Sequence, residues 1–194
     1  MSYHKKWLAH VSQEEIESEA SDFVSRVCVG DTLKITGEVY SALCVGCGDG
    51  REMSQLALLN KHLMGVRRLH GIDVNKSSAV KARGSWGFVI VGDMHYLPYR
   101  DDSFELVYTR DTFEHAISPI QVISELARVS NKYVSIILPD ETWQMGHFHF
   151  IVPTTVQMLS LGEKVGLLLK SFRSFWVIVG ASSLRQDIYV FQHG

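Results

Sequence analysis

The sequence lacks the features that mark membrane, nucleic-acid-binding and secreted proteins. No apolar run is long enough to span a bilayer, and the N-terminus has no apolar core of a signal peptide. The formal net charge is only -2 and there is no long basic patch, so we expect neither nucleic acid nor a membrane as a partner. Three cysteines give no even disulfide framework. We therefore expect a cytoplasmic protein.

The most informative stretch runs from Ser41 to Met53. It begins with the apolar run 42–45, which predicts a buried strand, and it ends in apolar residues at helical spacing. Three glycines lie between them at alternate positions, Gly46, Gly48 and Gly50. This layout is typical of a nucleotide-type cofactor loop, because glycine lets a ligand touch the main chain and leaves exposed amides to hold an anionic group. An ordinary glycine-rich turn is the alternative.

The glycine spacing separates two kinds of cofactor. A dinucleotide site needs Gly-x-Gly-x-x-Gly, and here the third glycine would fall on Arg51 or Met53. The segment Leu43–Gly50 instead resembles motif I of the class I S-adenosylmethionine (SAM)-dependent methyltransferases. It departs from that motif at Cys44, where the family usually has an acidic residue that braces the loop. The resemblance implies SAM as the cofactor.

Three later segments resemble the same family in the same order. Asp73 ends a predicted strand, where the family's acid accepts the ribose hydroxyls, although it could simply cap the next helix. Asp93 and Met94 stand where the family contacts adenine, with a surface turn as the alternative. Residues 110–115 resemble the family's strand end and its Leu-Glu-His segment. The resemblance implies a cofactor site made of Gly46, Cys47, Gly48, Gly50, Met53, Asp73, Val74, Asp93, Met94 and Arg110.

A hydroxyl or protonated amine that accepts a methyl group needs a proton sink. The candidates are His115, His147 and His149, with Arg110 and Asp111 as groups that position the substrate. Each histidine could equally serve only in packing. His147 and His149 could form half of a metal site, but no partner pair with ligand spacing is visible, so we predict no metal.

The predicted function is transfer of a methyl group from SAM to an oxygen or nitrogen of a small-molecule acceptor. A non-catalytic methyltransferase-like binding module is the alternative, and Cys44 is its best support. A nicotinamide-dependent oxidoreductase is disfavoured by the glycine spacing. A redox role for Cys44 and Cys47 is disfavoured because Cys44 lies inside the apolar strand. No Asn/Asp-Pro-Pro-Tyr motif follows the strand at 104–109, which argues against methylation of a DNA base or glutamine. The oligomeric state stays open.

The alternation of strands and helices predicts an α/β fold. We expect a doubly wound, Rossmann-like sheet of seven mostly parallel strands, with helices on both faces and one antiparallel strand from a C-terminal hairpin. All 194 residues should form one domain, with an N-terminal helical cap (1–40), a cofactor-binding core (41–138) and a substrate loop, helix and closing hairpin (139–194). The predicted boundaries include a helix at 12–28 with a loop at 30–31, a helix ending near Gly65, helices at 76–83, 119–129 and 153–165, a turn at 130–132, and hairpin strands at 174–179 and 187–192.

Overall fold

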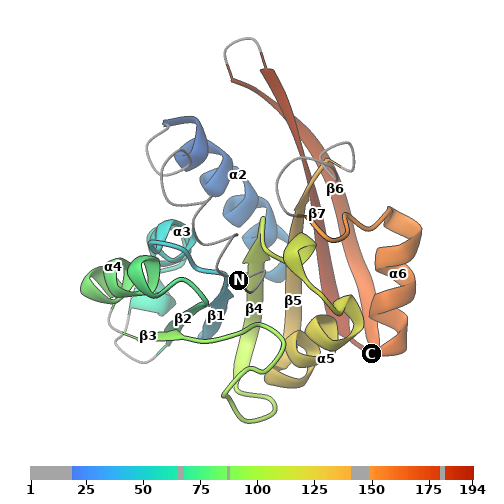
Figure 1. Ribbon diagram of the computed structural model, residues 1–194, viewed down its shortest axis with the longest axis horizontal. Coiled ribbons are helices and arrows are strands. Elements are labelled where there is room, and N and C mark those ends of the chain that lie inside the picture. Colours follow the sequence, from blue (N-terminus) through green and yellow to red (C-terminus); the bar gives the residue numbers. More distant parts are fainter. Residues whose placement is uncertain (1–18, 65–67, 87, 141–148, 180–181) are drawn as a thin grey trace, which may run out of the picture.

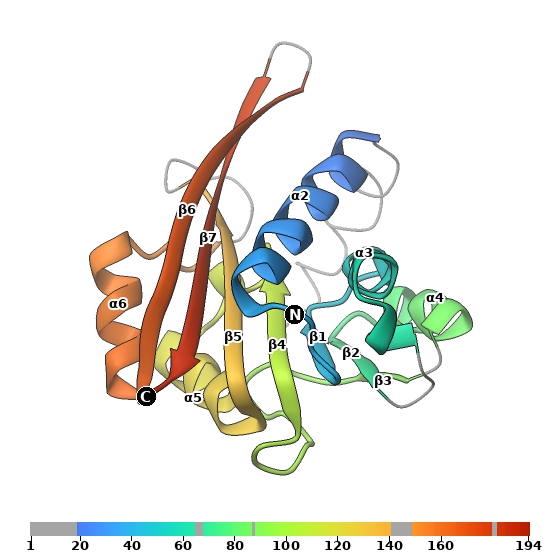
Figure 2. The same cartoon turned by 180° about the vertical axis from the view of Figure 1, so that it is seen from behind.

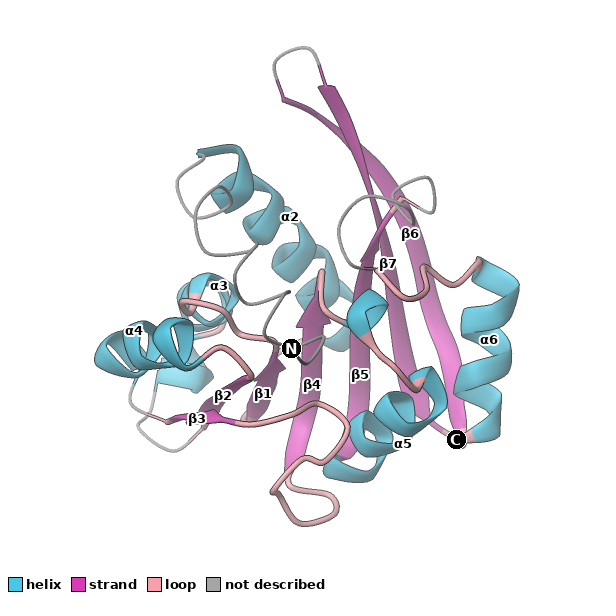
Figure 3. Ribbon diagram, in the orientation of Figure 1, coloured by secondary structure: helices cyan, strands magenta, loops and turns pink. Residues whose placement is uncertain are grey.

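The computed structural model describes residues 19–64, 68–86, 88–140, 149–179 and 182–194. Their strands form one sheet in the spatial order β3-β2-β1-β4-β5-β7-β6 (Figure 3). The strands are β1 (Ala42–Val45), β2 (Leu69–Asp73), β3 (Val89–Val91), β4 (Phe104–Arg110), β5 (Ser130–Pro139), β6 (Leu167–Val179) and β7 (Ser182–His193). The helices are α2 (Glu19–Thr36), α3 (Arg51–Leu59), α4 (Lys76–Trp86), α5 (Pro119–Val129) and α6 (Thr155–Lys164), with short 3-10 helices η1 (Lys61–Met64) and η2 (Phe113–His115). No helix in these described ranges combines the length and the apolar character that crossing a bilayer requires.

The strand directions confirm the predicted doubly wound sheet. β1 pairs in parallel with β2 and β4, β2 with β3, and β4 with β5. β7 runs antiparallel to both β5 and β6, so it is the reversed strand of the C-terminal hairpin. The chain builds outward from β1 toward β3 and then returns to place β4 on the other side of β1. Ligands of such sheets bind outside the carboxyl ends of the strands at this reversal point.

Each face of the sheet carries its own hydrophobic core, because side chains alternate between the faces along a strand. Ala42 and Cys44 of β1 pack in the cluster that includes residues of α2, α3 and α4. Leu43 and Val45 pack in the other cluster, with residues of α5 and α6. Figure 1 shows α5 and α6 in front of the sheet, and Figure 2 shows α2 in front of the opposite face. Helices on both faces were predicted, and this is confirmed.

Helix α2 is longer at its C-terminal end than the sequence suggested. We expected a loop at residues 30–31, but the helix runs through Gly30 and Asp31 to Thr36. Tertiary packing explains the difference, because Asp31 is buried and its carboxylate pairs with Lys34 and lies 2.7 Å from Arg173 on β6. The residue after the helix is Gly37, which has a φ of 71°. The predicted start of this helix, at residues 12–18, lies outside the described residues.

Other predicted boundaries were wrong by a few residues. α3 ends at Leu59 rather than near Gly65, and the Asn60 carboxamide then donates to the Val39 carbonyl. α4 continues through Gly84. Residues 130–132 are not a turn, because β5 begins directly after α5, and the two hairpin strands are longer than the predicted 174–179 and 187–192.

Candidate functional site

The three glycines form a tight turn between β1 and α3. Gly46, Gly48 and Gly50 have φ values of 69°, 52° and 97°, in the region that other residues rarely adopt. The N–H groups of Gly46 and Cys47 both donate to the Ile72 carbonyl, with N···O distances of 2.9 and 3.1 Å. The Gly50 N–H donates to the Cys47 carbonyl at 2.9 Å. The turn is therefore fixed against the end of β2 by its own main chain.

The N–H groups of Gly46, Cys47, Gly48 and Gly50 all donate within the protein, so these four amides are not available to an anion. The predicted role of the amides in the first turn of α3 stays a prediction. The turn also offers space. A Cβ atom added to Gly48 would meet no atom within 4 Å, so a ligand could approach the main chain there.

Asp73 braces this open turn from the end of β2. Its Oδ2 accepts the Gly48 N–H at 2.8 Å and its Oδ1 accepts the Asn75 N–H at 2.7 Å. Burial raises the pKa of Asp73, although the two N–H groups oppose that shift. Each carboxylate oxygen can accept a further hydrogen bond, so Asp73 can still receive a pair of ribose hydroxyls. Asp73 thus supplies a brace of the kind that the family's acid provides at the position of Cys44.

The geometry does not support a redox role for Cys44 and Cys47. Both are free thiols buried in the core, and burial raises the pKa of each well above its ordinary value. The side chain of Met53 is also wholly buried, and it lies against Gly71. The predicted cofactor contacts of Cys47 and Met53 therefore do not come from their buried side chains, which leaves the main chain of each residue.

Arg110 is held by carboxylates of the protein. Its Nε and Nη2 both lie 2.8 Å from Oε1 of Glu52 on α3, and its Nη1 lies 3.0 Å from Oδ2 of Asp111. Burial opposes the charged form, but these two carboxylates raise the pKa of Arg110 well above its ordinary value. Asp111 also accepts from Gln186 on β7 at 3.2 Å. The pair predicted to position a substrate is thus engaged in joining α3, β4 and β7.

Asp93 lies in the loop after β3 and fixes a neighbouring imidazole. Its Oδ1 accepts the His95 N–H at 2.8 Å and lies 2.6 Å from His95 Nδ1. The Ser118 N–H donates to His95 Nε2 at 3.3 Å, so both ring nitrogens of His95 have a partner in the protein. The Asp93 side chain is still 39% exposed. Met94 is partly buried and packs against the cluster that contains Leu43 and Val45. Val74 is partly exposed beside Asp73.

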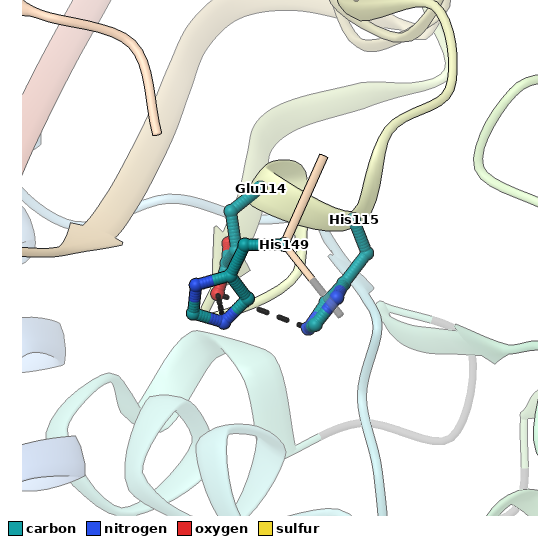
Figure 4. A group of neighbouring side chains, drawn as sticks. All are labelled: Glu114, His115 and His149. Atoms are coloured by element: carbon teal, nitrogen blue, oxygen red, sulfur yellow. Dashed lines mark ion pairs between the residues drawn. The ribbon is translucent and has the colours of Figure 1, made fainter. Parts of the chain in front are cut away.

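Glu114 and His115, which follow β4, lie close to His149, which comes shortly before α6 (Figure 4). The Nε2 atoms of His115 and His149 lie 4.0 and 3.9 Å from the same atom, Oε1 of Glu114. The two rings meet edge to face with centroids 5.0 Å apart. Two of the three predicted catalytic histidines are therefore brought together, while His147 lies outside the described residues.

Sequence reasoning missed three polar residues of this region. Glu52, Glu114 and His95 were not predicted, although each has a local signal. Glu52 stands in the first turn of the helix after the glycines, Glu114 precedes His115, and His95 is two residues beyond Asp93. What the sequence could not show is that Glu52 pairs with Arg110 on β4 and that Glu114 lies near His149.

A cavity of about 270 Å³ lies beside the C-terminal part of the sheet. It is lined by residues 152–156 at the start of α6 and by Arg185 and Asp187 of β7. The Asp187 carboxylate accepts hydrogen bonds from Arg185 at 2.9 and 2.6 Å and from the Ser174 hydroxyl. The cavity is therefore lined by an ion pair, two threonines and three apolar side chains.

Comparisons with known proteins agree on one kind of domain. Residues 43–137 match the family model described as a methyltransferase domain. The fold is similar to that of magnesium protoporphyrin IX methyltransferase from Synechocystis with bound S-adenosylhomocysteine (TM-score 0.68, 12% identity, 100% of this chain and 95% of that chain). It is also similar to a SAM-dependent methyltransferase from Methanosarcina mazei (TM-score 0.62, 14% identity, 80% of this chain and 92% of that chain).

One curated protein shares recognisable sequence. It is an uncharacterized 37.1 kDa protein in a transposon of Streptomyces fradiae, 30% identical over 108 residues. The match covers 53% of this chain but only 30% of that protein.

Proposed function

We propose that this chain, which matches the methyltransferase-domain model over residues 43–137, is a class I SAM-dependent methyltransferase that transfers a methyl group from SAM to an oxygen or nitrogen of a small molecule. One observation carries the proposal. The open main chain at Gly48 lies next to a carboxylate, Asp73, that is bonded to the Gly48 N–H and keeps acceptor capacity for ribose hydroxyls.

The residues around the turn fit the cofactor. Asp73 would take the ribose hydroxyls, and the half-exposed carboxylate of Asp93, held by His95, would take the adenine amino group. SAM supplies an activated methyl group on its sulfonium. The protein's part is then to align the acceptor atom and exclude water, which can lower the barrier by about 7 kcal/mol or more.

The acceptor side is proposed to lie at the end of β4. Thr112 packs directly on Gly46, so the residues that follow, Glu114 and His115, are held next to the glycine turn. His149 joins them from the segment before α6. An imidazole of His115 or His149 can take the proton from a hydroxyl or ammonium acceptor, a contribution of about 10²–10⁴ in rate.

Calorimetric titration with SAM and with S-adenosylhomocysteine tests the cofactor part. We expect one equivalent to bind to the wild type and at least tenfold weaker binding to Asp73→Asn. Glu105→Gln is the matched control, because the Glu105 carboxylate also accepts a main-chain N–H, from Tyr40, away from the turn. Absence of SAM binding to the folded wild type would overturn the proposal.

The transfer itself is measured by the S-adenosylhomocysteine formed with panels of hydroxyl and amine acceptors. We expect turnover with a member of one panel, and a loss of turnover without loss of SAM binding in His149→Ala. Unchanged turnover in both His115→Ala and His149→Ala would exclude these histidines as the proton acceptor.

A further inference from the structure

We propose that Glu114, His115 and His149 form a binding site for a divalent transition-metal ion of the zinc type. The three side chains converge from two separate segments, η2 and the residues just before α6, as Figure 4 shows. Each offers one ligand atom, and no two of these atoms are more than 4.8 Å apart. The sequence pattern did not predict this site, because Glu114 and His115 precede β5 and His149 follows it, 34 positions after His115.

The distances suit a bound ion better than direct contacts. Two other histidine–carboxylate pairs of this chain, His62 with Glu38 and His95 with Asp93, lie at 2.7 and 2.6 Å, which are hydrogen-bond lengths. Both imidazoles of the Glu114 group stand at 3.9–4.0 Å from the carboxylate oxygen, beyond that length. The carboxylate oxygen therefore has two imidazole nitrogen atoms near it, both at a distance that a shared metal ion could bridge.

The separations of the three ligand atoms suit a single metal ion between them. A point equidistant from the three ligand atoms lies roughly 2.5 Å or less from each, given their separations of 4.0, 3.9 and at most 4.8 Å. Zinc bonds to imidazole nitrogen and carboxylate oxygen measure about 2.0–2.2 Å. The side chains would need to close in by only a few tenths of an ångström.

The surroundings hold the ligands in place. Glu114 is 1% exposed, and the histidine side chains are 15% and 6% exposed. The Glu114 carbonyl accepts the N–H groups of Phe150 and Ile151 at 2.9 and 3.3 Å. The segment that carries His149 is thus fixed to η2 by main-chain bonds.

The donor set also indicates the metal and its use. Two imidazoles and one glutamate are the ligands of catalytic zinc sites that keep a further position open. An open position next to the glycine turn could take an acceptor hydroxyl, whose pKa the metal would lower. In the metal-bound protein the ligating nitrogens would not accept the proton, which would pass to solvent, so the metal would replace the imidazole in promoting loss of the proton. This last use rests on the proposed function, whereas metal binding by Glu114 and the two histidines does not.

Cobalt(II) is the probe, because its visible absorption reports the nitrogen and oxygen ligands around it. Tag-free protein is treated with chelator, dialysed and titrated with Co²⁺, and Zn²⁺ is then added in competition. We expect one equivalent of Co²⁺, displaced by Zn²⁺, and at least tenfold weaker binding in Glu114→Gln and His149→Ala. His62→Ala is the control, since it removes an imidazole from another histidine–carboxylate pair and should leave binding unchanged.

A second measurement needs no variant. Co²⁺ added to ¹⁵N-labelled wild type should shift or broaden the amide signals of Ala116 and Phe150, and leave that of Tyr40, beside His62, unchanged. No cobalt spectrum in the wild type, or equal affinity in the ligand variants, would overturn the metal site. SAM titration of the same samples separates the two proposals, since a protein that binds SAM and no metal loses only this one.

Discussion

Alanine at Gly48 should separate cofactor binding from folding. Gly48 has a φ of 52°, and a left-handed conformation costs a non-glycine residue about 1–2 kcal/mol. The added methyl group would meet no protein atom within 4 Å and would occupy the space that we assign to SAM. Gly37 is the matched control, because it has a φ of 71°, equally open surroundings, and a position at the end of α2.

Gly46→Ala should behave differently from both. Its φ of 69° brings the same strain, but its Cβ would overlap the Thr112 side chain. Overpacking of this kind costs about 1–3 kcal/mol, so the total is about 2–5 kcal/mol. For a protein of this length each kcal/mol lowers the Tm by about 2–4 °C. Thermal unfolding should therefore show a clearly larger loss in Gly46→Ala than in Gly48→Ala or Gly37→Ala.

Calorimetry with SAM completes the test. Gly48→Ala should bind at least tenfold more weakly than Gly37→Ala, a difference of about 1.4 kcal/mol or more. Equal affinity in the two variants would refute the assignment of the space above Gly48 to the cofactor. Equal stability of Gly46→Ala and Gly37→Ala would show that the Thr112 side chain can move away from the added methyl group without lowering the stability.

The remaining predictions concern buried charges and thiols. Glu52→Gln should lower the free energy of unfolding in denaturant titration by about 3 kcal/mol, because it breaks a buried pair but leaves Arg110 a second carboxylate; a loss below 1 kcal/mol would contradict this. Hydrogen bonds from Arg128 lower the pKa of Glu125 from its ordinary 4.5, so this pair stabilises the fold above about pH 4.5 and is lost as the pH falls through the lower folded pKa. Glu125→Gln should flatten that part of the stability profile, and an unaltered profile would count against it. Cys44 should react with iodoacetamide only after unfolding, because burial raises its pKa, and rapid labelling of native protein at pH 8 would disagree.

The predictable parts of the fold are those decided by local sequence. The helix at 119–129 was predicted at its observed bounds, because a proline start and a regular apolar face define it. The positive φ of Gly48 is likewise a local property that its residue type signals. The loop predicted at residues 30–31 was wrong. Helix α2 continues through Gly30, because buried contacts with distant strands outweigh the local preference of glycine for a loop.

The candidate site was predictable only in part for the same reason. Asp73 was predicted as a site residue from its position at a strand end, but its bond to Gly48 depends on the pairing of β1 with β2. The approach of His149 to Glu114 depends on the full path of β5 and the segment beyond it. Such contacts between residues distant in the chain carry no periodic pattern that a single sequence displays.

Because Asp73 braces the glycine turn, the stability of the short edge strand β3 should be coupled to ligand binding. Asp73 closes β2, whose outer neighbour β3 has only three residues and forms the rim. When β3 unfolds locally, β2 loses its outer neighbour and the Asp73 carboxylate is held less firmly. Ligand binding at the turn and local unfolding of β3 should therefore disfavour each other. A bound ligand should therefore slow amide hydrogen exchange in β3, a strand that contributes no predicted contact to it.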